Sequence, residues 1–299
     1  MLTVCIPVYN QNVERLVKEL SAQVKLLHGK VSILLIDDAS SEEFQAQYKI
    51  IRAFAKVIQL DVNIGRSKIR NAFLEYTSAD YLLFLDCDAQ IVRSDFLSKY
   101  LEFIKVNRPK VLFGASIYQK ETPPINYRLR WKYGSTIESK SFQFRISAPQ
   151  LGFKTNNFLV DRNILKSYPF NELITGYGHE DTLFGFELEQ NGISICHIDN
   201  PVLNAHLDSN SQFLNKTDEA LNNLFHIWEL SEKNELLLER LNILKVYFRH
   251  ERNLILSITL RCLMRPLRFL LDRGVSSLTL FNLYKLAYLF AFNPAQRRQ

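Results

Sequence analysis

The run YLLFLDCD occupies residues 81–88 of a chain of 299 residues, and it gives the clearest indication of the fold. Five apolar or aromatic residues in succession are typical of a strand that is buried on both faces in a parallel sheet. Two carboxylates, Asp86 and Asp88, follow this run at once. Ligands of open α/β sheets bind at the carboxyl ends of the strands, and Mg²⁺ prefers carboxylate oxygens together with substrate phosphates. The stretch therefore predicts a metal and diphosphate site, although such aspartates also occur in ordinary solvated turns.

Patterns of strand and helix alternate along the chain before this stretch. Residues 2–8, 31–36 and 57–60 are apolar runs, and apolar residues recur at helical spacing between the first two of them. Such alternation implies parallel strands that are joined by right-handed crossovers. We therefore predict an α/β fold with a mostly parallel central sheet flanked by helices. A further strand is expected at residues 110–118, and no glycine-rich dinucleotide motif follows the first strand.

The net charge of +6 is distributed unevenly. Residues 240–299 hold eleven Lys or Arg and two acidic residues, which gives +9 and leaves −3 for residues 1–239. A mildly acidic body lacks the basic face that nucleic-acid binding requires, so no nucleic-acid partner is expected. Four scattered cysteines, without disulfide or zinc spacing, favour a reducing compartment. Because the first ten residues also lack the pattern of a secretory signal, we expect a cytoplasmic protein.

The C-terminal region interleaves arginines with apolar clusters, and residues 275–292 are apolar apart from a few positions such as Lys285. This pattern favours a helix that lies in a membrane interface, whereas Lys285 in mid-run argues against a spanning helix. The alternative is a helical hairpin that packs on the body or on a second subunit. We predict an α/β domain at residues 1–228 and a helical, basic region at 229–299 that binds the inner face of the cell membrane.

Four motifs occur in a fixed order within the first 90 residues. They are IPVYN at 6–10, IDDAS at 36–40, NIG at 63–65 followed by Arg70, and DCD at 86–88. This ordered set resembles family-2 glycosyltransferases, which implies the GT-A fold and a nucleoside-diphosphate sugar as donor, with a UDP-sugar expected first. The resemblance implies that Mn²⁺ or Mg²⁺ is held by Asp86 and Asp88. It assigns donor binding to the following residues: Pro7, Val8, Tyr9, Asn10, Asp38, Gly65, Arg70, Asp86, Cys87 and Asp88. For Asp38 the alternative is a helix cap or a turn residue.

A second block, GYGHED at residues 176–181, precedes a helical pattern. The glycines allow the backbone to approach a ligand closely. The block resembles the Gly-aromatic-Gly-x-Glu-Asp motif of galactosyltransferase-type C-terminal regions, which implies Asp181 as the catalytic base and Glu180 as a sugar-binding residue. Simple capping is the alternative, because carboxylates are stabilised at a helix N-terminus.

Less specific patterns supply the remaining candidates. Paired amides match sugar hydroxyls, although they also satisfy turns. We therefore place five residues in the acceptor or sugar site: Asn156, Asn157, Gly176, Tyr177 and Gly178. The likeness to GT-A enzymes implies a further histidine ligand of the metal, for which His206 has the fitting spacing; a surface histidine is the alternative. Residues 121–144 have no clean period and are expected to form a loop over the donor, an acceptor segment or a surface connection.

These observations together predict a metal-dependent inverting glycosyltransferase. It would move a hexose or related sugar to a glycan or a lipid-linked glycan in bacterial surface-polysaccharide synthesis. Asp181 would take the proton of the acceptor hydroxyl in a single displacement with an oxocarbenium-like transition state. The alternatives are a catalytically inactive sugar-nucleotide-binding protein and a membrane scaffold on the same fold.

Overall fold

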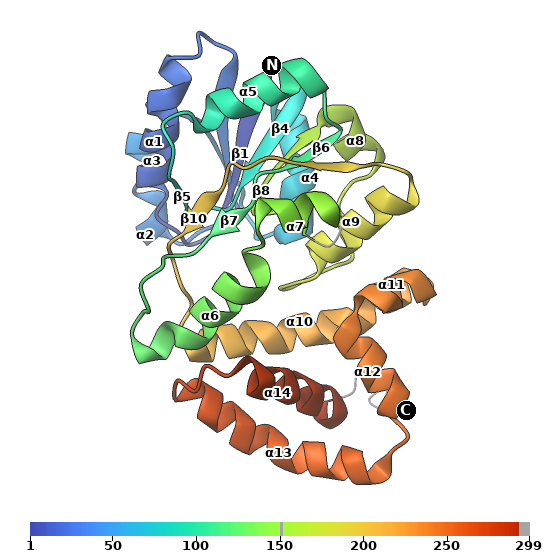
Figure 1. The fold of residues 1–299 in the computed structure, drawn as a ribbon. Helices are drawn as coiled ribbons and strands as arrows, with labels where there is room; N and C mark the ends of the chain where they lie inside the picture. The colour runs from blue at the N-terminus through green and yellow to red at the C-terminus, as the bar shows by residue number, and fades with distance from the viewer. Residues whose placement is uncertain (150–151, 293–299) are drawn as a thin grey trace. The chain divides into compact units, whose positions relative to one another are not determined.

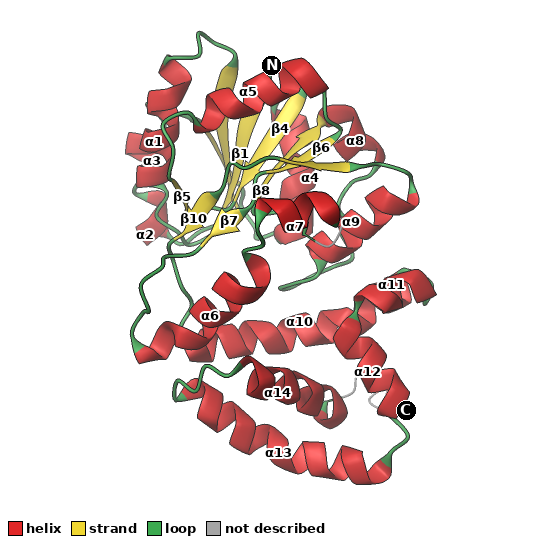
Figure 2. Ribbon diagram, viewed as in Figure 1, coloured by secondary structure: helices red, strands yellow, loops and turns green. Residues whose placement is uncertain are grey.

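The structure is a computed structural model that describes residues 1–149 and 152–292. Its elements are drawn along the chain in Figure 1 and by type in Figure 2. The chain forms two compact units. The first unit comprises residues 1–119, 138–175 and 180–206, and the second comprises residues 120–137, 176–179 and the chain from residue 207 onward.

A seven-stranded sheet is the centre of the first unit, in the order β3-β2-β1-β4-β8-β6-β9. Neighbouring strands are parallel, except that β8 is antiparallel to both β4 and β6. The predicted mostly parallel α/β sheet is therefore confirmed. The apolar run of residues 81–85 is β4, and four of its five residues are buried. The strands are β1 (Leu2–Val8), β2 (Val31–Asp37), β3 (Lys56–Gln59), β4 (Tyr81–Leu85), β6 (Val111–Phe113), β8 (Asn157–Asp161) and β9 (Ile195–His197).

Helices cover both faces of this sheet (Figure 2). Successive strand residues point to opposite faces, so Val4 and Ile6 of β1 belong to one core and Cys5 belongs to the other. The first core is closed by α1 (Glu14–Lys25), α3 (Tyr48–Ile51) and α5 (Phe96–Asn107). The second is closed by α4 (Arg66–Tyr76), α8 (Arg162–Ser167) and α9 (Glu180–Gln190). Two shorter helices of the first unit are α2 (Glu42–Gln45) and α7 (Phe142–Ser147).

The strand that we predicted over residues 110–118 is two strands in two sheets. β6 ends at Phe113, and β7 (Ser116–Ile117) joins β5 (Ala89–Ile91) and β10 (Val202–Asn204) in a small sheet. Gly114 separates β6 from β7: a Cβ there would lie 2.0 Å from Tyr100 Oη and 2.5 Å from Asn157 Nδ2. A side chain at position 114 would clash with these buried polar groups, so only glycine fits where the chain passes from β6 to β7.

The second unit is helical. Its C-terminal part contains α10 (Asn210–Leu230), α11 (Glu235–Arg240), α12 (Asn242–His250), α13 (Leu254–Asp272) and α14 (Leu278–Ala291). α10 begins with a capping box in which Ser209 and Gln212 satisfy each other's backbone N–H groups. The helical C-terminal region is thus confirmed. The predicted boundary at residue 228 falls inside α10; that residues 1–228 fold alone stays a prediction.

Two expectations for these segments change. Residues 121–144 are largely helical, with η1 (Ile125–Tyr127), α6 (Arg128–Tyr133), the π-helix η2 (Gly134–Glu138) and the start of α7. α14 packs on α13, and its Phe281, Tyr284 and Phe290 are buried, as in the helical hairpin that was the alternative; attachment of this region to a membrane stays a prediction. Within the described residues, no helix has both the length and the apolarity that crossing a bilayer requires.

Candidate active site

The site is centred on the turn that follows β4. The Asp86 N–H donates to the Asn156 carbonyl over 3.1 Å, and the Asp86 carbonyl accepts from the Ala89 N–H over 3.1 Å, which fixes residues 86–88 between β4 and β5. Burial, followed by repulsion from Asp86, raises the pKa of Asp88 to about 6. Among the described residues Asp88 forms no ion pair with a basic side chain. Two acidic groups are therefore held close together at the carboxyl end of the central strand.

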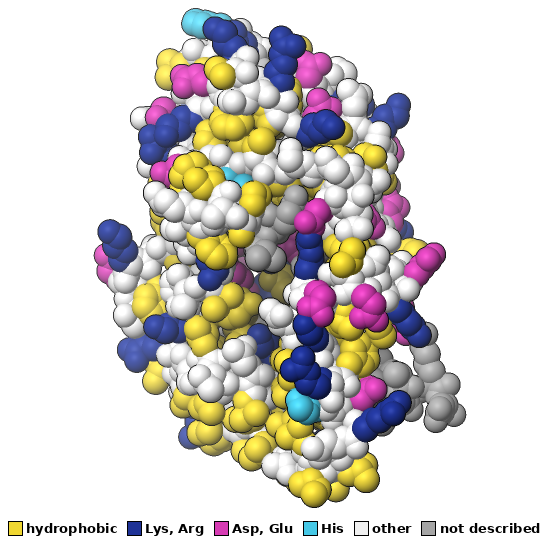
Figure 3. Space-filling view, turned by 45° about the vertical axis from the view of Figure 1, so that its right-hand side comes forward, with side chains coloured by type: hydrophobic (Ala, Val, Ile, Leu, Met, Phe, Trp, Pro, Cys, Tyr) yellow, Lys and Arg dark blue, Asp and Glu magenta, His cyan; other side chains and the backbone are white. Residues whose placement is uncertain are grey.

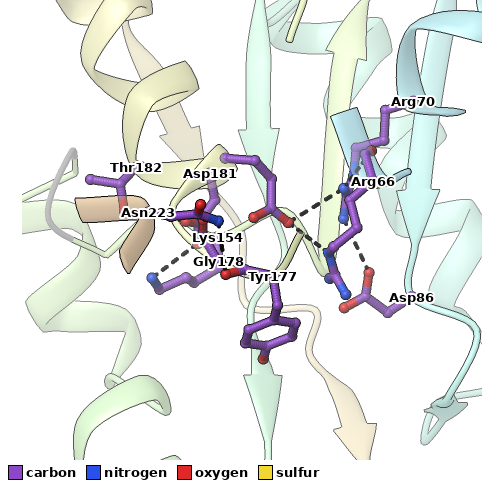
Figure 4. A network of polar contacts seen from close by, with 10 residues as sticks. Arg66, Arg70, Asp86, Lys154, Tyr177, Gly178, Asp181, Thr182 and Asn223 are labelled. Atoms are coloured by element: carbon purple, nitrogen blue, oxygen red, sulfur yellow. Dashed lines mark hydrogen bonds and ion pairs between the residues drawn. The ribbon is translucent and has the colours of Figure 1, made fainter. Parts of the chain in front are cut away.

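Two arginines of α4 connect this turn to α9, as Figure 4 shows. Arg70 is only 2% exposed; its Nη2 lies 3.5 Å from Asp86 Oδ1 and its Nη1 lies 3.5 Å from Glu180 Oε1. Arg66 Nε donates to Glu180 Oε1 over 2.8 Å. Burial raises the pKa of Asp86, and the two arginines only partly oppose this. The arrangement joins a carboxylate of the β4 turn to a carboxylate of the GYGHED block.

Glu180 and Asp181 occupy different environments at the first turn of α9. The Glu180 side chain is 7% exposed; burial alone would raise its pKa, but Arg66 and Arg70 outweigh burial and hold the pKa below its ordinary value. Asp181 is 16% exposed, and its Oδ2 lies 3.0 Å from Lys154 Nζ. Glu180 is therefore a buried, charged anchor, whereas Asp181 is the more accessible carboxylate of the pair.

The residues predicted to hold the nucleotide lie at the carboxyl ends of β1 and β2. Tyr9 is 53% exposed, which leaves its ring accessible, whereas Val8 is buried. The Asp38 carboxylate accepts from the backbone N–H of Ile64 at 2.7 Å and of Gly65 at 3.1 Å. Asp38 thus has the turn role that was its alternative, and its contact with a ribose stays a prediction. Gly65 has a φ of 84°, which suits glycine and directs the chain into α4.

Asn10 and Pro7 complete this edge of the sheet. The Asn10 side chain accepts from the Ser41 N–H over 2.9 Å and its backbone N–H donates to Ser40 Oγ over 2.8 Å. Asn10 therefore ties the end of β1 to the loop after β2. Pro7 is partly buried within β1. Both residues lie where the sequence placed them, at the strand end.

The two asparagines at the start of β8, Asn156 just before the strand and Asn157 as its first residue, have separate roles. Asn157 is fully buried: its Oδ1 accepts from Tyr100 Oη, and its Nδ2 donates to the carbonyls of Ala115 and Asn200. These contacts give Asn157 a structural role in place of the predicted sugar contact. Asn156 lies beside the β4 turn; its Nδ2 donates to Ser116 Oγ, and its Oδ1 is buried without a hydrogen-bond partner among the described residues. The contact of Asn156 with a sugar stays a prediction.

Residues 176–179 belong to the second unit. Gly176 and Gly178 have φ values of 78° and 98°, which glycine adopts readily. Asn223 of α10 donates to the Tyr177 carbonyl at 3.1 Å and to the Gly178 carbonyl at 3.3 Å. A Cβ on Gly178 would lie 2.6 Å from Ala220 Cβ, so close packing on α10 also requires this glycine. The glycines therefore shape a loop on α10, and their contact with a sugar stays a prediction.

His206 follows β10, which pairs antiparallel with β5 so that Asn204 is opposite Ala89. The charge of His206 acts to lower the pKa of Asp88, and its role as a metal ligand stays a prediction. Among residues 1–149 and 152–292, no three His, Cys, Asp or Glu side chains meet in the arrangement of a ready metal site. Asp86 and Asp88 still fit Mg²⁺ or Mn²⁺, because such ions take one or two carboxylates together with water and substrate phosphates.

Two residues of this network were not predicted from the sequence. Arg66 lies four residues before Arg70, so the two side chains share one face of α4, and that spacing is a signal that was available. Lys154 lies in the segment before β8, and its sequence context carries no signal of its pairing with Asp181. Positive charge therefore reaches the carboxylates from two segments: from Arg66 and Arg70 of α4, and from Lys154 before β8.

The chain belongs to glycosyltransferase family 2. The model of this family, described as Glycosyl transferase family 2, matches residues 3–168, which is more than half of the chain. The predicted family resemblance is thereby confirmed. The match covers the strand ends of the donor side and ends before Glu180 and Asp181, so their assignment depends on the local contacts.

Two solved structures of S. aureus TarS show the same fold, and a third solved structure is similar at a lower score. S. aureus TarS 1–349 in complex with UDP has a TM-score of 0.54 and 18% identity, over 100% of this chain and 92% of that chain. S. aureus TarS has a TM-score of 0.53 and 18% identity, over 96% of this chain and 54% of that chain. Glucosyl-3-phosphoglycerate synthase from Mycobacterium tuberculosis, in complex with Mn²⁺, UDP and glucosyl-3-phosphoglycerate, has a TM-score of 0.46 and 17% identity, over 70% of this chain and 71% of that chain. The sequence matches no curated protein.

Proposed function

We propose that this protein is an inverting glycosyltransferase that uses a nucleoside-diphosphate sugar. One observation carries the proposal: Arg70 lies between Asp86 of the β4 turn and Glu180 of α9, 3.5 Å from each carboxylate. The donor-side acidic turn and the Glu180-Asp181 pair are thereby part of one network within the first unit. A glycosyl transfer needs both parts, one to hold the leaving diphosphate and one to accept the proton of the attacking hydroxyl.

The donor side would be formed by the strand ends. The exposed ring of Tyr9 suits stacking on a nucleobase, and Asp38 and Asn10 line the same edge. Asp86 and Asp88, with His206 as the predicted third ligand, would hold Mn²⁺ or Mg²⁺. When bound, such an ion neutralises the charge that develops on the departing diphosphate. TarS 1–349 binds UDP, which supports uridine as the first base to test.

The acceptor side would depend on Asp181. Its carboxylate takes the proton of the acceptor hydroxyl while the hydroxyl oxygen bonds to the anomeric carbon, and the bond from that carbon to the diphosphate oxygen breaks with both electrons. The displacement inverts the anomeric centre, and no covalent enzyme intermediate forms. Because Lys154 lies 3.0 Å from Asp181, acceptor binding has to replace this ion pair. Glu180, held by Arg66 and Arg70, fixes the first turn of α9.

The acceptor would be a glycan or a lipid-linked glycan at the cytoplasmic face of the cell membrane, in the assembly of a bacterial surface polysaccharide. The basic, apolar C-terminal region supports an acceptor that is presented at a membrane. The alternative, an inactive sugar-nucleotide-binding protein or scaffold, is disfavoured by the retention of Asp86, Asp88 and Asp181 in the connected network.

The test is calorimetry of UDP and UDP-sugars with and without Mn²⁺, followed by an assay of UDP release in the presence of glycan acceptors. We expect metal-dependent binding, which Asp88→Asn abolishes without loss of the fold. Asp95→Asn is the matched control, because Asp95 is an exposed aspartate outside the site. Nucleotide binding that is equally strong without metal, or in Asp88→Asn, contradicts the proposed metal site. An absence of binding to every nucleotide sugar contradicts the donor assignment itself.

A further inference from the structure

Helix α13 presents apolar side chains where a surface helix normally presents charges. Its solvent-facing stripe contains residues spaced by three or four, which places them on one face: Ile255, Ile258, Cys262, Pro266 and Phe269. Ile255 is 81% exposed, Ile258 is 63% exposed and Phe269 is 55% exposed. Figure 3 shows hydrophobic side chains gathered at the lower end of the second unit, the end at which Figure 1 places α13. A continuous exposed apolar face of this kind marks a site of interaction.

This stripe is not needed to hold α13 in place. The opposite face of the helix carries Leu260, Leu267 and Leu271, which are buried, and α13 packs on α10 and α14. α13 therefore has two apolar faces, of which one builds the core of the second unit and the other stays in solvent. The exposed face is the one that requires an explanation outside the fold.

The charge around the stripe indicates what covers it. Residues 249–273 contain six arginines and two acidic residues, a net charge of +4, and Arg268 is the one of the six that is paired with Asp218 of α10. Arg252, Arg265 and Arg273 are exposed, and the Arg273 guanidinium lies 4.4 Å from the Phe269 ring centroid, so that it borders the apolar stripe. Exposed apolar side chains flanked by arginine are the pattern of helices that lie in a lipid interface, with the apolar face inserted and the arginines at the headgroups.

We propose that the exposed face of α13 docks on an anionic phospholipid bilayer, with the helix axis along the surface. A second copy of the chain is the competing occupant. A two-fold contact between two α13 faces would place arginine against arginine, whereas anionic headgroups compensate the same charges. The surface differs from the one expected from the sequence, since α14, the more apolar helix, is buried and α13 holds the exposed residues.

The first test is flotation of the full chain with phosphatidylcholine vesicles and with phosphatidylcholine–phosphatidylglycerol vesicles. We expect binding to the mixed vesicles that is weakened by salt and retained in part by apolar insertion. Ile258→Glu and Phe269→Glu should each weaken binding about tenfold or more, because a carboxylate would enter the interface. Leu26→Glu is the matched control, since Leu26 is 73% exposed in the first unit and should not affect vesicle binding.

A second measurement does not depend on these variants. Cys262 is the exposed cysteine of the four, and it lies on the stripe. A polarity-sensitive fluorophore on Cys262 should shift its emission to the blue when mixed vesicles are added, and Arg265→Glu should reduce this shift at low salt. Wild-type protein that stays unbound, or a label that does not respond, overturns the proposal. The proposal is also overturned if light scattering detects a dimer that Ile258→Glu dissociates and that does not bind vesicles. UDP binding by each variant separates this result from a failure of the proposed donor site.

Discussion

Arg70 in the first unit and Arg268 in the second unit each lie between acidic and aromatic partners, but their contacts differ. Arg268 Nη1 lies 2.5 Å from Asp218 Oδ2 and from Tyr284 Oη, and Tyr284 Oη also donates to Asp218 Oδ1 over 2.6 Å. Arg70 lies 3.5 Å from each of its two carboxylates, its Nη1 donates to the Arg66 carbonyl over 3.0 Å, and its buried Nε has no hydrogen-bond partner among the described residues. Arg268 is therefore paired with its carboxylate at a shorter distance than Arg70 is with either of its two.

The pKa values of the two arginines shift in opposite directions. Burial lowers the pKa of Arg70, and its neighbours do not compensate, since Arg66 lowers the pKa further. For Arg268, Tyr284 and Asp218 outweigh burial and raise the pKa. Complete pairing of buried polar groups stabilises a fold, and each unpaired one calls for an explanation. Arg145 Nε and Trp228 Nε1 are also buried without a hydrogen-bond partner among the described residues, so loose pairing does not by itself define a site. Arg70 differs from Arg268 in that its two carboxylates, Asp86 and Glu180, are both predicted site residues.

The largest effect should come from Asp181→Asn. An amide cannot accept the proton of the acceptor hydroxyl, so kcat should fall by about 10²–10⁴-fold while UDP-sugar affinity changes little. Turnover assays and calorimetry on the same protein measure the two quantities. Glu187→Gln, on the same helix, is the control. A mutant with near-normal turnover would sink the assignment of the base.

Arg70→Met should have the next largest effect. It leaves Asp86 and Glu180 without their shared cation, and removal of one partner of a buried pair typically costs about 3–5 kcal/mol. Urea unfolding measures the loss, and nucleotide binding should decrease as well. Lys68→Met, at an exposed position of α4, is the control. A stable Arg70→Met protein with normal activity would show that the loose pairing has no functional meaning.

Arg268→Met should sharpen the contrast from the other side. Its side chain is 33% exposed and that of Asp218 is 18% exposed, so the expected loss of about 1–3 kcal/mol lies between those of surface and buried pairs. The kcat of the remaining folded protein should equal that of the wild type. Loss of activity at unchanged stability would contradict a purely structural role.

The smallest effect concerns Lys285 of α14, whose ammonium lies 4.9 Å from the Phe281 ring centroid and 5.7 Å from that of Tyr133. Burial lowers the pKa of Lys285 from 10.5 to about 8. Between these two pH values, Lys285 is protonated in the unfolded chain but largely neutral in the folded chain. The free energy of unfolding should therefore increase by about 1–2 kcal/mol as the pH rises from about 8 towards 10.5. The cation–π contacts favour the charged form and keep this increase small. Thermal unfolding across this range should show the slope, and Lys285→Met should remove it.

The strands β1, β2 and β4, whose ends form the site, were predictable because each is a continuous apolar run. β4 is buried on both faces, so its composition alone places Asp86 and Asp88 at a strand end. The antiparallel insertion of β8 was not predictable in this way. A short apolar strand has the same composition in either direction, and its partners are far away in sequence.

Side-chain partners were harder to predict than strand ends. Asn156 and Asn157 are adjacent, yet Asn156 lies beside the acidic turn, just before β8, whereas Asn157 begins β8 and lies in the core. For α13 and α14, periodicity identifies an apolar face but not what covers it. In the structure, α14 buries its apolar face, whereas α13 exposes a stripe that the sequence analysis did not identify.

The antiparallel strand β8 also has a consequence for the order of events during synthesis. β4 and β6 are joined only through β8, so a nascent chain that ends before Asn157 leaves one edge of the apolar β4 unpaired. Unpaired strand edges are prone to aggregate and are bound by chaperones. Sheets that pair strands far apart in the sequence also fold slowly. Ribosome-bound chains that end before residue 157 should therefore be cleaved by protease more readily than chains in which residue 161 has left the exit tunnel.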